Sequence, residues 1–198
     1  MNRIVAALAL LFSGVSAFAP TPTITRGTVQ VKASTEGMPG IVAPTGLFDP
    51  VGLAAKATDA RLKYFRESEL KHGRVAMLAS LGFVVGEKFH PLFNGAIDEP
   101  SYIAFQATPL QKLWPFVLTA IGTVEYISID KFNAPAEGFW TLKAEYENGD
   151  LGFDPLGLKP TDPEKLKTMQ TKEIQNGRLA MLGIAGMVAQ ELVTGGKL

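Results

Sequence analysis

The sequence predicts an all-α membrane protein with three transmembrane helices. The first and third helices are expected to be long, tilted, crossed and related by a pseudo-two-fold axis. A charged motif occurs twice, 104 residues apart, and each copy runs directly into an apolar stretch. A third apolar segment lies between the copies. Mean hydropathy is positive, +0.14, and 46% of residues are apolar, which favours membrane spans interrupted by polar groups.

The charged motif reads Glu-x-x-(His/Asn)-Gly-Arg-apolar-Ala-Met-Leu-small, and its copies begin at Glu69 and Glu173. On one helix Glu69 and Arg74 point about 140° apart and pair poorly. Charges at the edge of an apolar stretch are costly unless they are paired. Two such helices that cross about a local two-fold axis can exchange partners. We therefore expect the ion pairs Glu69–Arg178 and Glu173–Arg74.

Lone pairs remain after this pairing, because a carboxylate has two oxygens and one Arg need not use every acceptor position. His72 follows Glu69 by three residues, and Asn176 follows Glu173 by three, so each pair occupies neighbouring helix faces. Isolated donors, one for each site, suit a metal whose other positions are already filled. The magnesium of chlorophyll, held by four ring nitrogens, is such a metal.

Both motifs closely resemble helices one and three of the light-harvesting chlorophyll-binding proteins, and a Phe-Asp-Pro loop precedes each copy. The resemblance covers nearly all of the chain after residue 40. It is strongest to the fucoxanthin chlorophyll a/c-binding proteins of secondary red-lineage, diatom-type plastids. It implies axial chlorophyll ligands at Glu69, His72, Glu173 and Asn176, with Arg74 and Arg178 as ion-pair partners and no metal beyond chlorophyll magnesium.

The first residues are typical of targeting segments. Residues 1–35 contain no Asp or Glu, and Arg3 precedes an apolar run that is too short for a span. We expect a signal peptide at 1–17, a plastid transit segment at 18–34 and the chlorophyll-binding domain at 35–198. Phe18, at the junction, resembles the bipartite presequences of red-type plastids. An ordinary secretory signal is the alternative.

The duplicated loops are Phe48-Asp49-Pro50 and Phe153-Asp154-Pro155, 105 residues apart. Asp-Pro favours a turn, and Phe can enter a bilayer interface. The resemblance implies that Asp49 and Asp154 belong to loops that hold the polar ends of carotenoids. A plain turn with a hydrophobic anchor is the alternative.

The first helix is expected at about residues 58–87, with a charged first half and an apolar second half rich in small residues. His90 follows it as a further candidate ligand, with a solvent-facing loop His as the alternative. The second helix is expected at about 110–129. Its single charge from Leu113 onward, Glu125, is a functional candidate, and the resemblance implies another chlorophyll ligand there. A protonated or interfacial Glu125 without a ligand is the alternative.

The third helix is expected at about 163–194, opened by a capping box from Thr161 to Glu164. Gln190 lies fourteen residues after Asn176, on nearly the same face. The resemblance implies a chlorophyll ligand at Gln190, and a polar residue at the helix exit is the alternative. Because the sequence ends at Leu198, we expect the amphipathic helix of longer family members to be missing.

The resemblance implies a light-harvesting antenna in the plastid thylakoid membrane, spanning it several times and passing excitation energy to a photosystem. The implied pigments are chlorophyll a, chlorophyll c and fucoxanthin, with diadinoxanthin or a related xanthophyll. The implied partners are a photosystem I or II core, other antenna subunits and thylakoid lipids, in an oligomer or supercomplex. A net charge of zero argues against a nucleic-acid partner.

Two alternatives remain beside the antenna function. The first is a photoprotective, energy-quenching member of the same family, built on the same scaffold. The second is a di-iron membrane enzyme, because Glu-x-x-His is also a di-iron helix motif. Only the first copy carries that motif, and both glutamates have Arg partners that would repel an iron pair. We therefore expect no enzymatic activity and no catalytic residues.

Overall fold

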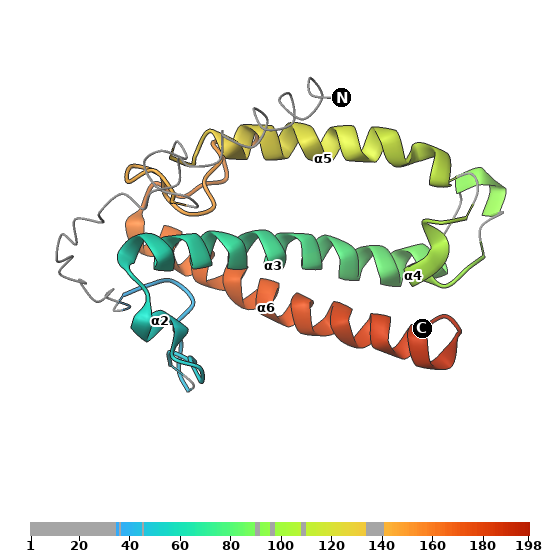
Figure 1. Ribbon diagram of the computed structural model, residues 1–198, viewed down its shortest axis with the longest axis horizontal. Coiled ribbons are helices and arrows are strands. Elements are labelled where there is room, and N and C mark those ends of the chain that lie inside the picture. Colours follow the sequence, from blue (N-terminus) through green and yellow to red (C-terminus); the bar gives the residue numbers. More distant parts are fainter. Residues whose placement is uncertain are drawn as a thin grey trace, which may run out of the picture. The chain divides into compact units, whose positions relative to one another are not determined.

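The computed structural model describes residues 35, 37–44, 46–89, 92–95, 98–107, 110–133 and 141–198. The expected signal peptide, the expected transit segment and His90 lie outside the described residues. The helices, in chain order, are α2 (Leu53–Lys56), α3 (Asp59–Lys88), α4 (Ser101–Ala104), α5 (Trp114–Ile129) and α6 (Pro163–Thr194), with 3₁₀ turns η1 (Leu92–Gly95) and η2 (Leu110–Leu113). The described residues form no strands, only two isolated bridges. The expected helical class is confirmed (Figure 1).

The ends of the long helices follow from their capping residues. Thr58 accepts a hydrogen bond from the Arg61 N–H at the start of α3. At the start of α6, the Asp162 side chain accepts from the Glu164 N–H at 3.1 Å. The expectation that Thr161 caps this helix was wrong. Pro163 takes the first helical position, which makes Asp162 the capping residue.

The second helix begins later than expected. Residues Leu110–Leu113 form a 3₁₀ turn, and the α-helix starts at Trp114, directly before Pro115. Proline is tolerated there because the first turn of a helix has no intrahelical partner for its N–H groups.

Helices α3 and α6 lie side by side and cross at a pair of glycines (Figure 1). A Cβ atom added at Gly73 would lie 3.0 Å from the Cα of Gly177, and the reverse holds at the same distance. Both glycines are buried and occupy the same place in the two copies of the motif. The absent side chains allow the two backbones to meet.

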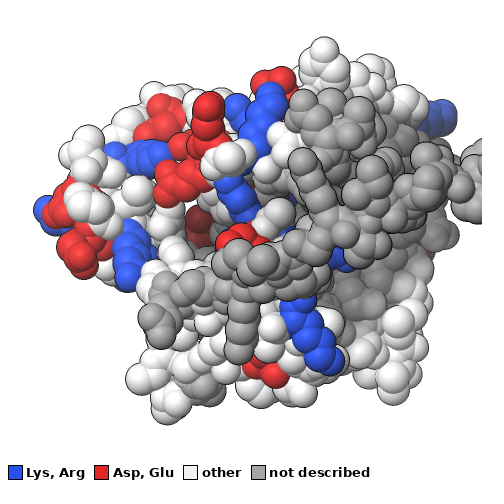
Figure 2. Space-filling model, turned by 60° about the vertical axis from the view of Figure 1, so that its left-hand side comes forward, with Lys and Arg blue, Asp and Glu red and all other residues white. Residues whose placement is uncertain are grey.

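Charge and apolar surface are divided along these helices. From Val75 to Gly86, and again from Leu179 to Gln190, no residue is charged. Large apolar side chains in these stretches are exposed, including Leu78 (73%), Leu81, Leu179 and Leu182 (75%). In the described part of the chain, no helix is both long enough and apolar enough to be identified as a membrane span. Figure 2 shows acidic and basic side chains next to one another on one face, in keeping with the ion pairs of the charged halves.

The glycine crossing gives a first prediction. Gly73→Val should lower the free energy of unfolding by about 1–3 kcal/mol, because the added carbons clash with the backbone of Gly177 and would force the helices apart. Gly82→Val is the matched control on the same helix, where an added Cβ meets nothing within 4 Å. Denaturant unfolding followed by far-UV circular dichroism compares the two. Equal losses in both variants would contradict the close crossing.

Candidate functional site

Two reciprocal ion pairs join α3 to α6 just outside the glycine crossing. Arg178 Nε donates to Glu69 Oε1 at 2.7 Å, and Arg74 Nε donates to Glu173 Oε1 at 2.8 Å. The four side chains are between 29% and 39% exposed, so both pairs are half-buried. The structure therefore contains both ion pairs that the duplicated motif predicts.

Each arginine also binds the carbonyl of a loop glycine. Arg178 Nη1 donates to Gly40 O at 2.7 Å, and Arg74 Nη2 donates to Gly149 O at 2.9 Å. Both glycines have a left-handed φ, +88° and +82°. A Cβ would lie 2.9 Å from Ile174 at the first and 2.8 Å from Arg74 at the second, so neither position accepts a larger residue without a shift.

The amides of the same two glycines are bound as well. Gly40 N–H donates to Thr171 Oγ1 at 3.3 Å, and Gly149 N–H donates to Glu67 Oε2 at 2.9 Å. Residues 67 and 171 are again 104 apart, so the duplication includes a loop glycine that docks on each helix. The sequence did not reveal this relation, because the glycines themselves are 109 residues apart.

Glu67 is a buried carboxylate that sequence reasoning missed. It is 4% exposed and accepts from Tyr146 Oη at 3.0 Å as well as from the Gly149 amide. Burial, together with the nearby Glu67 carboxylate, raises the pKa of Tyr146 well above its ordinary value. The phenol therefore stays protonated and holds the 146–149 loop against α3.

The two motif glutamates differ in how much of each carboxylate is engaged. Glu69 accepts one N–H on each oxygen, because Arg66 Nη1 binds its Oε2 at 2.7 Å. Glu173 accepts on Oε1 alone, and its Oε2 forms no bond among the described residues. Each carboxylate oxygen can accept about two hydrogen bonds, so lone pairs remain at both sites.

His72, Asn176 and Gln190 carry nitrogen or oxygen atoms that could bind a metal. His72 Nδ1 lies 2.7 Å from the carbonyl oxygen of Ser68, so this nitrogen donates to the helix backbone and Nε2 is left for another partner. The Asn176 side chain is exposed and makes no hydrogen bond in the described part of the chain. Gln190, farther along α6, is likewise exposed with an unbonded side-chain amide. All three side chains therefore place a candidate metal ligand at the protein surface.

Glu125 on α5 is not the unpaired carboxylate that the sequence indicated. Lys71 Nζ from α3 donates to its Oε2 at 2.7 Å. The partner was missed because it comes from another helix, 54 residues away in sequence.

The two Phe-Asp-Pro loops fold alike. Asp49 accepts from the N–H groups of Leu53 and Ala54, and Asp154 accepts from those of Leu158 and Lys159, at 2.8–3.0 Å. Desolvation opposes ionisation of Asp49, but its backbone N–H partners outweigh this and lower its pKa. Backbone N–H bonds also lower the pKa of Asp154. Both carboxylates build turns that leave the preceding phenylalanines, Phe48 and Phe153, 80% and 87% exposed.

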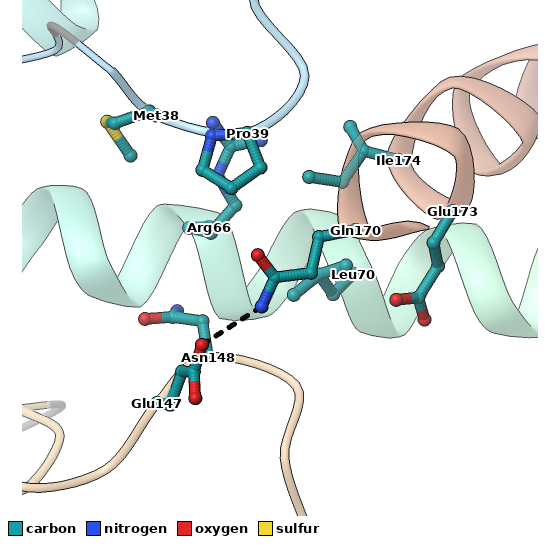
Figure 3. A pocket seen from close by; sticks show the side chains of 9 residues that line it. All are labelled: Met38, Pro39, Arg66, Leu70, Glu147, Asn148, Gln170, Glu173 and Ile174. Carbon is teal, nitrogen blue, oxygen red and sulfur yellow. Dashed lines mark hydrogen bonds between the residues drawn. The ribbon is translucent and has the colours of Figure 1, made fainter. Parts of the chain in front are cut away.

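Three clefts surround the ion pairs. One of about 520 Å³ lies between Phe48, Glu69 and Arg178, and one of about 310 Å³ continues past Asp49 to Phe65. A third of about 210 Å³ lies beside Glu173 (Figure 3). It is bordered by a hydrogen bond of 3.0 Å from Gln170 to Glu147. Each copy of the motif thus adjoins an open cleft.

A second acidic cluster lies at the opposite ends of α3 and α6. Glu191 is fully buried, and its Oε2 accepts from the Tyr102 N–H at 2.9 Å. The carboxyl group of Glu87, near the end of α3, lies close by and accepts from the Leu198 N–H at 2.7 Å. Oε1 of Glu191 is buried and has no hydrogen-bond partner among the described residues. Both residues lie outside the charged motif, although they are again 104 residues apart.

Comparisons with known proteins agree with these features. The model of the family described as chlorophyll A-B binding protein matches residues 33–192. Light-harvesting complex stress-related protein 3.2 of Chlamydomonas reinhardtii is 53% identical over 172 residues, which cover 83% of this chain and 66% of that protein. The match thus spans just under two thirds of that relative's length.

Fucoxanthin-binding proteins are similar over more of their own length. The fucoxanthin-chlorophyll a-c binding protein of Isochrysis galbana is 47% identical over 164 residues, 80% of this chain and 78% of that protein. Fucoxanthin-chlorophyll a-c binding protein D of Phaeodactylum tricornutum is 31% identical over 194 residues, 94% of each. All three relatives are described as chloroplastic.

The unequal ion pairs give a second prediction. Arg74→Met should lower the free energy of unfolding by about 1 kcal/mol, and Arg178→Met by less. The reason is that Glu69 keeps Arg66, whereas Glu173 keeps no cation in the described structure. Each variant also loses a bond to a glycine carbonyl, but Gly40 O keeps the Gln175 amide as a donor, so this loss acts in the same direction. Denaturant unfolding measures both, and a larger loss for Arg178→Met would contradict the assignment.

Proposed function

Because this chain belongs to the chlorophyll A-B binding protein family, whose members bind pigments and are not enzymes, we propose that it holds chlorophylls and carotenoids in the thylakoid membrane. The reciprocal ion pairs between α3 and α6 carry this proposal. They neutralise two carboxylates at the start of apolar helix segments while leaving oxygen lone pairs for a metal that needs one further ligand.

The donor set fits the magnesium of chlorophyll. Six side chains are assigned as axial ligands, each offering a single oxygen or nitrogen: Glu69, His72, Glu125, Glu173, Asn176 and Gln190. Magnesium prefers oxygen donors, and an axial imidazole or amide also suits a ring that already fills four positions. Bound chlorophyll supplies light absorption and the transfer of excitation to neighbouring pigments. The protein's part is to fix the spacing and angle of each ring.

The Phe-Asp-Pro turns are assigned to carotenoid end groups. The cleft of about 310 Å³ beside Asp49 is lined by apolar side chains that include Phe48, Leu62 and Phe65. This lining suits the ring of a xanthophyll, whose hydroxyl group could donate to an oxygen of the Asp49 turn. Chlorophyll a, chlorophyll c and fucoxanthin are the proposed pigments, because two of the relatives are described as fucoxanthin-chlorophyll a-c binding proteins.

Helices α3, α5 and α6 are the proposed membrane spans. At about 1.5 Å per residue, 30 and 32 residues give α3 and α6 lengths of about 45 and 48 Å, enough to cross a hydrocarbon core of about 30 Å with tilt and protrusion. Their exposed leucines would then face lipid or pigment. Glu69 and Glu173 are each paired with an arginine, and this pairing makes their charges tolerable near the apolar segments.

We propose energy dissipation as the main role, since the stress-related relatives are 53% and 51% identical to this chain. Light harvesting for a photosystem, within an antenna oligomer or supercomplex, is the second candidate. The 47% identity to a fucoxanthin-chlorophyll a-c binding protein favours it. The two roles share one scaffold and differ in whether acid shortens the excited-state lifetime.

Pigment stoichiometry tests the shared scaffold. The full chain, refolded in detergent with an extract containing chlorophylls a and c and fucoxanthin, should bind all three. Asn176→Val should lose about one chlorophyll per chain with its helix content unchanged. Asn176→His, which copies the residue of the first motif, should keep it because imidazole also donates a lone pair. A colourless wild-type chain, or equal pigment in all three proteins, would contradict the ligand assignment.

Fluorescence lifetime separates the two roles. If the chain dissipates energy, acidification should shorten the chlorophyll lifetime of the pigment-loaded protein. Glu191 is fully buried, and its Oε1 has no hydrogen-bond partner among the described residues, so acid is expected to act at this carboxyl group. Glu191→Gln should therefore weaken the acid response. Glu164→Gln, in the first turn of the same helix, is the matched control and should leave it intact. A lifetime independent of pH would favour the antenna role.

A further inference from the structure

The carboxylate of Glu125 is held on one side only. Its Oε2 accepts from Lys71 Nζ at 2.7 Å and lies 3.1 Å from Ser128 Oγ. Lys71 Nζ also donates to Ser128 Oγ at 2.9 Å, and Ser128 is 3% exposed. The other oxygen, Oε1, forms no hydrogen bond with the described residues. A buried serine and a lysine thus fix one oxygen and leave the second available.

Position 71 is also where the duplicated motif departs from its own pattern. The equivalent residue of the second copy is Gln175, whose amide donates to Gly40 O at 3.1 Å. Glu, Gly and Arg are kept in both copies, yet the copy that reaches α5 carries a lysine. The position carries a cation in the copy where it faces the carboxylate of Glu125, and a neutral amide in the copy where it faces a backbone carbonyl.

We propose that Lys71 is a positioning residue that balances the charge of Glu125, so that Oε1 can serve as an axial chlorophyll ligand. This inference rests on the proposed pigment-binding function. Arginines from the opposite copy provide the balancing charge for Glu69 and Glu173. A lysine provides it for Glu125, where its ammonium group engages Oε2 and leaves Oε1 available.

The physical reason is the cost of an isolated charge in apolar surroundings. A carboxylate that is covered by a chlorophyll ring and lipid loses its water, and this loss is offset only when an opposite charge lies beside it. Without Lys71, retaining Glu125 under a pigment becomes unfavourable, and the site should lose its ring. A neutral amide at position 125 has an oxygen lone pair and needs no such partner.

The test counts chlorophylls in the full chain refolded with the same extract of chlorophylls a and c and fucoxanthin. Glu125→Ala should lose about one chlorophyll per chain, and Lys71→Met should lose the same one, identified by the same absorption difference. Lys71→Arg should keep it. The double variant Lys71→Met/Glu125→Gln should regain it, because a neutral ligand requires no cation. Lys88→Met, an exposed lysine of the same helix without a described partner, is the matched control and should lose none.

The outcomes separate a charge-balancing role from a purely structural link between α3 and α5. If the double variant stays as depleted as Lys71→Met, with normal far-UV circular dichroism, Lys71 acts only as a link and the inference is overturned. Full pigment in Lys71→Met, or in Glu125→Ala, overturns it as well, while the other chlorophylls still support the proposed function. A wild-type chain that binds no chlorophyll overturns both.

Discussion

The reciprocal exchange of arginines between α3 and α6 is the interaction on which the rest of the structure depends. Each guanidinium binds the glutamate of the opposite helix at 2.7–2.8 Å and the carbonyl of a loop glycine at 2.7–2.9 Å. One side chain thus fixes the helix crossing and the docking of a loop at once. The crossing in turn requires the close approach of Gly73 to Gly177. The same contacts leave lone pairs on the carboxylates, and the proposed pigment binding depends on those lone pairs.

The duplication is a constraint on backbone and charge rather than on every side chain. Glycines 40 and 149 make equivalent contacts, but their amides bind a hydroxyl in one copy and a carboxylate in the other. The two motif glutamates likewise differ, because Arg66 has no equivalent cation at Gln170. Two sites that begin from one pattern therefore differ in charge. Lys71 in place of Gln175 extends this difference toward α5.

Helix positions and the exchange of ion pairs could be predicted from the sequence, because both depend on periodicity and on the cost of unpaired charge along a single repeating register. The start of α6 was placed at its proline, although the cap proved to be Asp162. The contacts of Glu67, Glu87, Glu191 and Lys71 could not be found in this way. Tyr146 and Glu67 are 79 residues apart, and Lys71 and Glu125 are 54 apart, separations that follow no repeat. Glu87 and Glu191 are 104 apart, in register with the duplication, but they lie outside the charged motif. Only the folded chain brings those groups together.

The paired residues are far apart along the chain, and this determines when the site can form. Glu69 and Arg178 are separated by 109 positions, and Arg74 and Glu173 by 99. During synthesis the first copy therefore emerges with Arg74 lacking its glutamate and with Glu69 paired only to Arg66 of its own helix. Helix α3 cannot form its native crossing until α6 has been made, since the partners of its charges lie on α6. Assembly is consequently a late event that needs nearly the whole polypeptide, and a chain truncated before Arg178 would have no route to the native crossing.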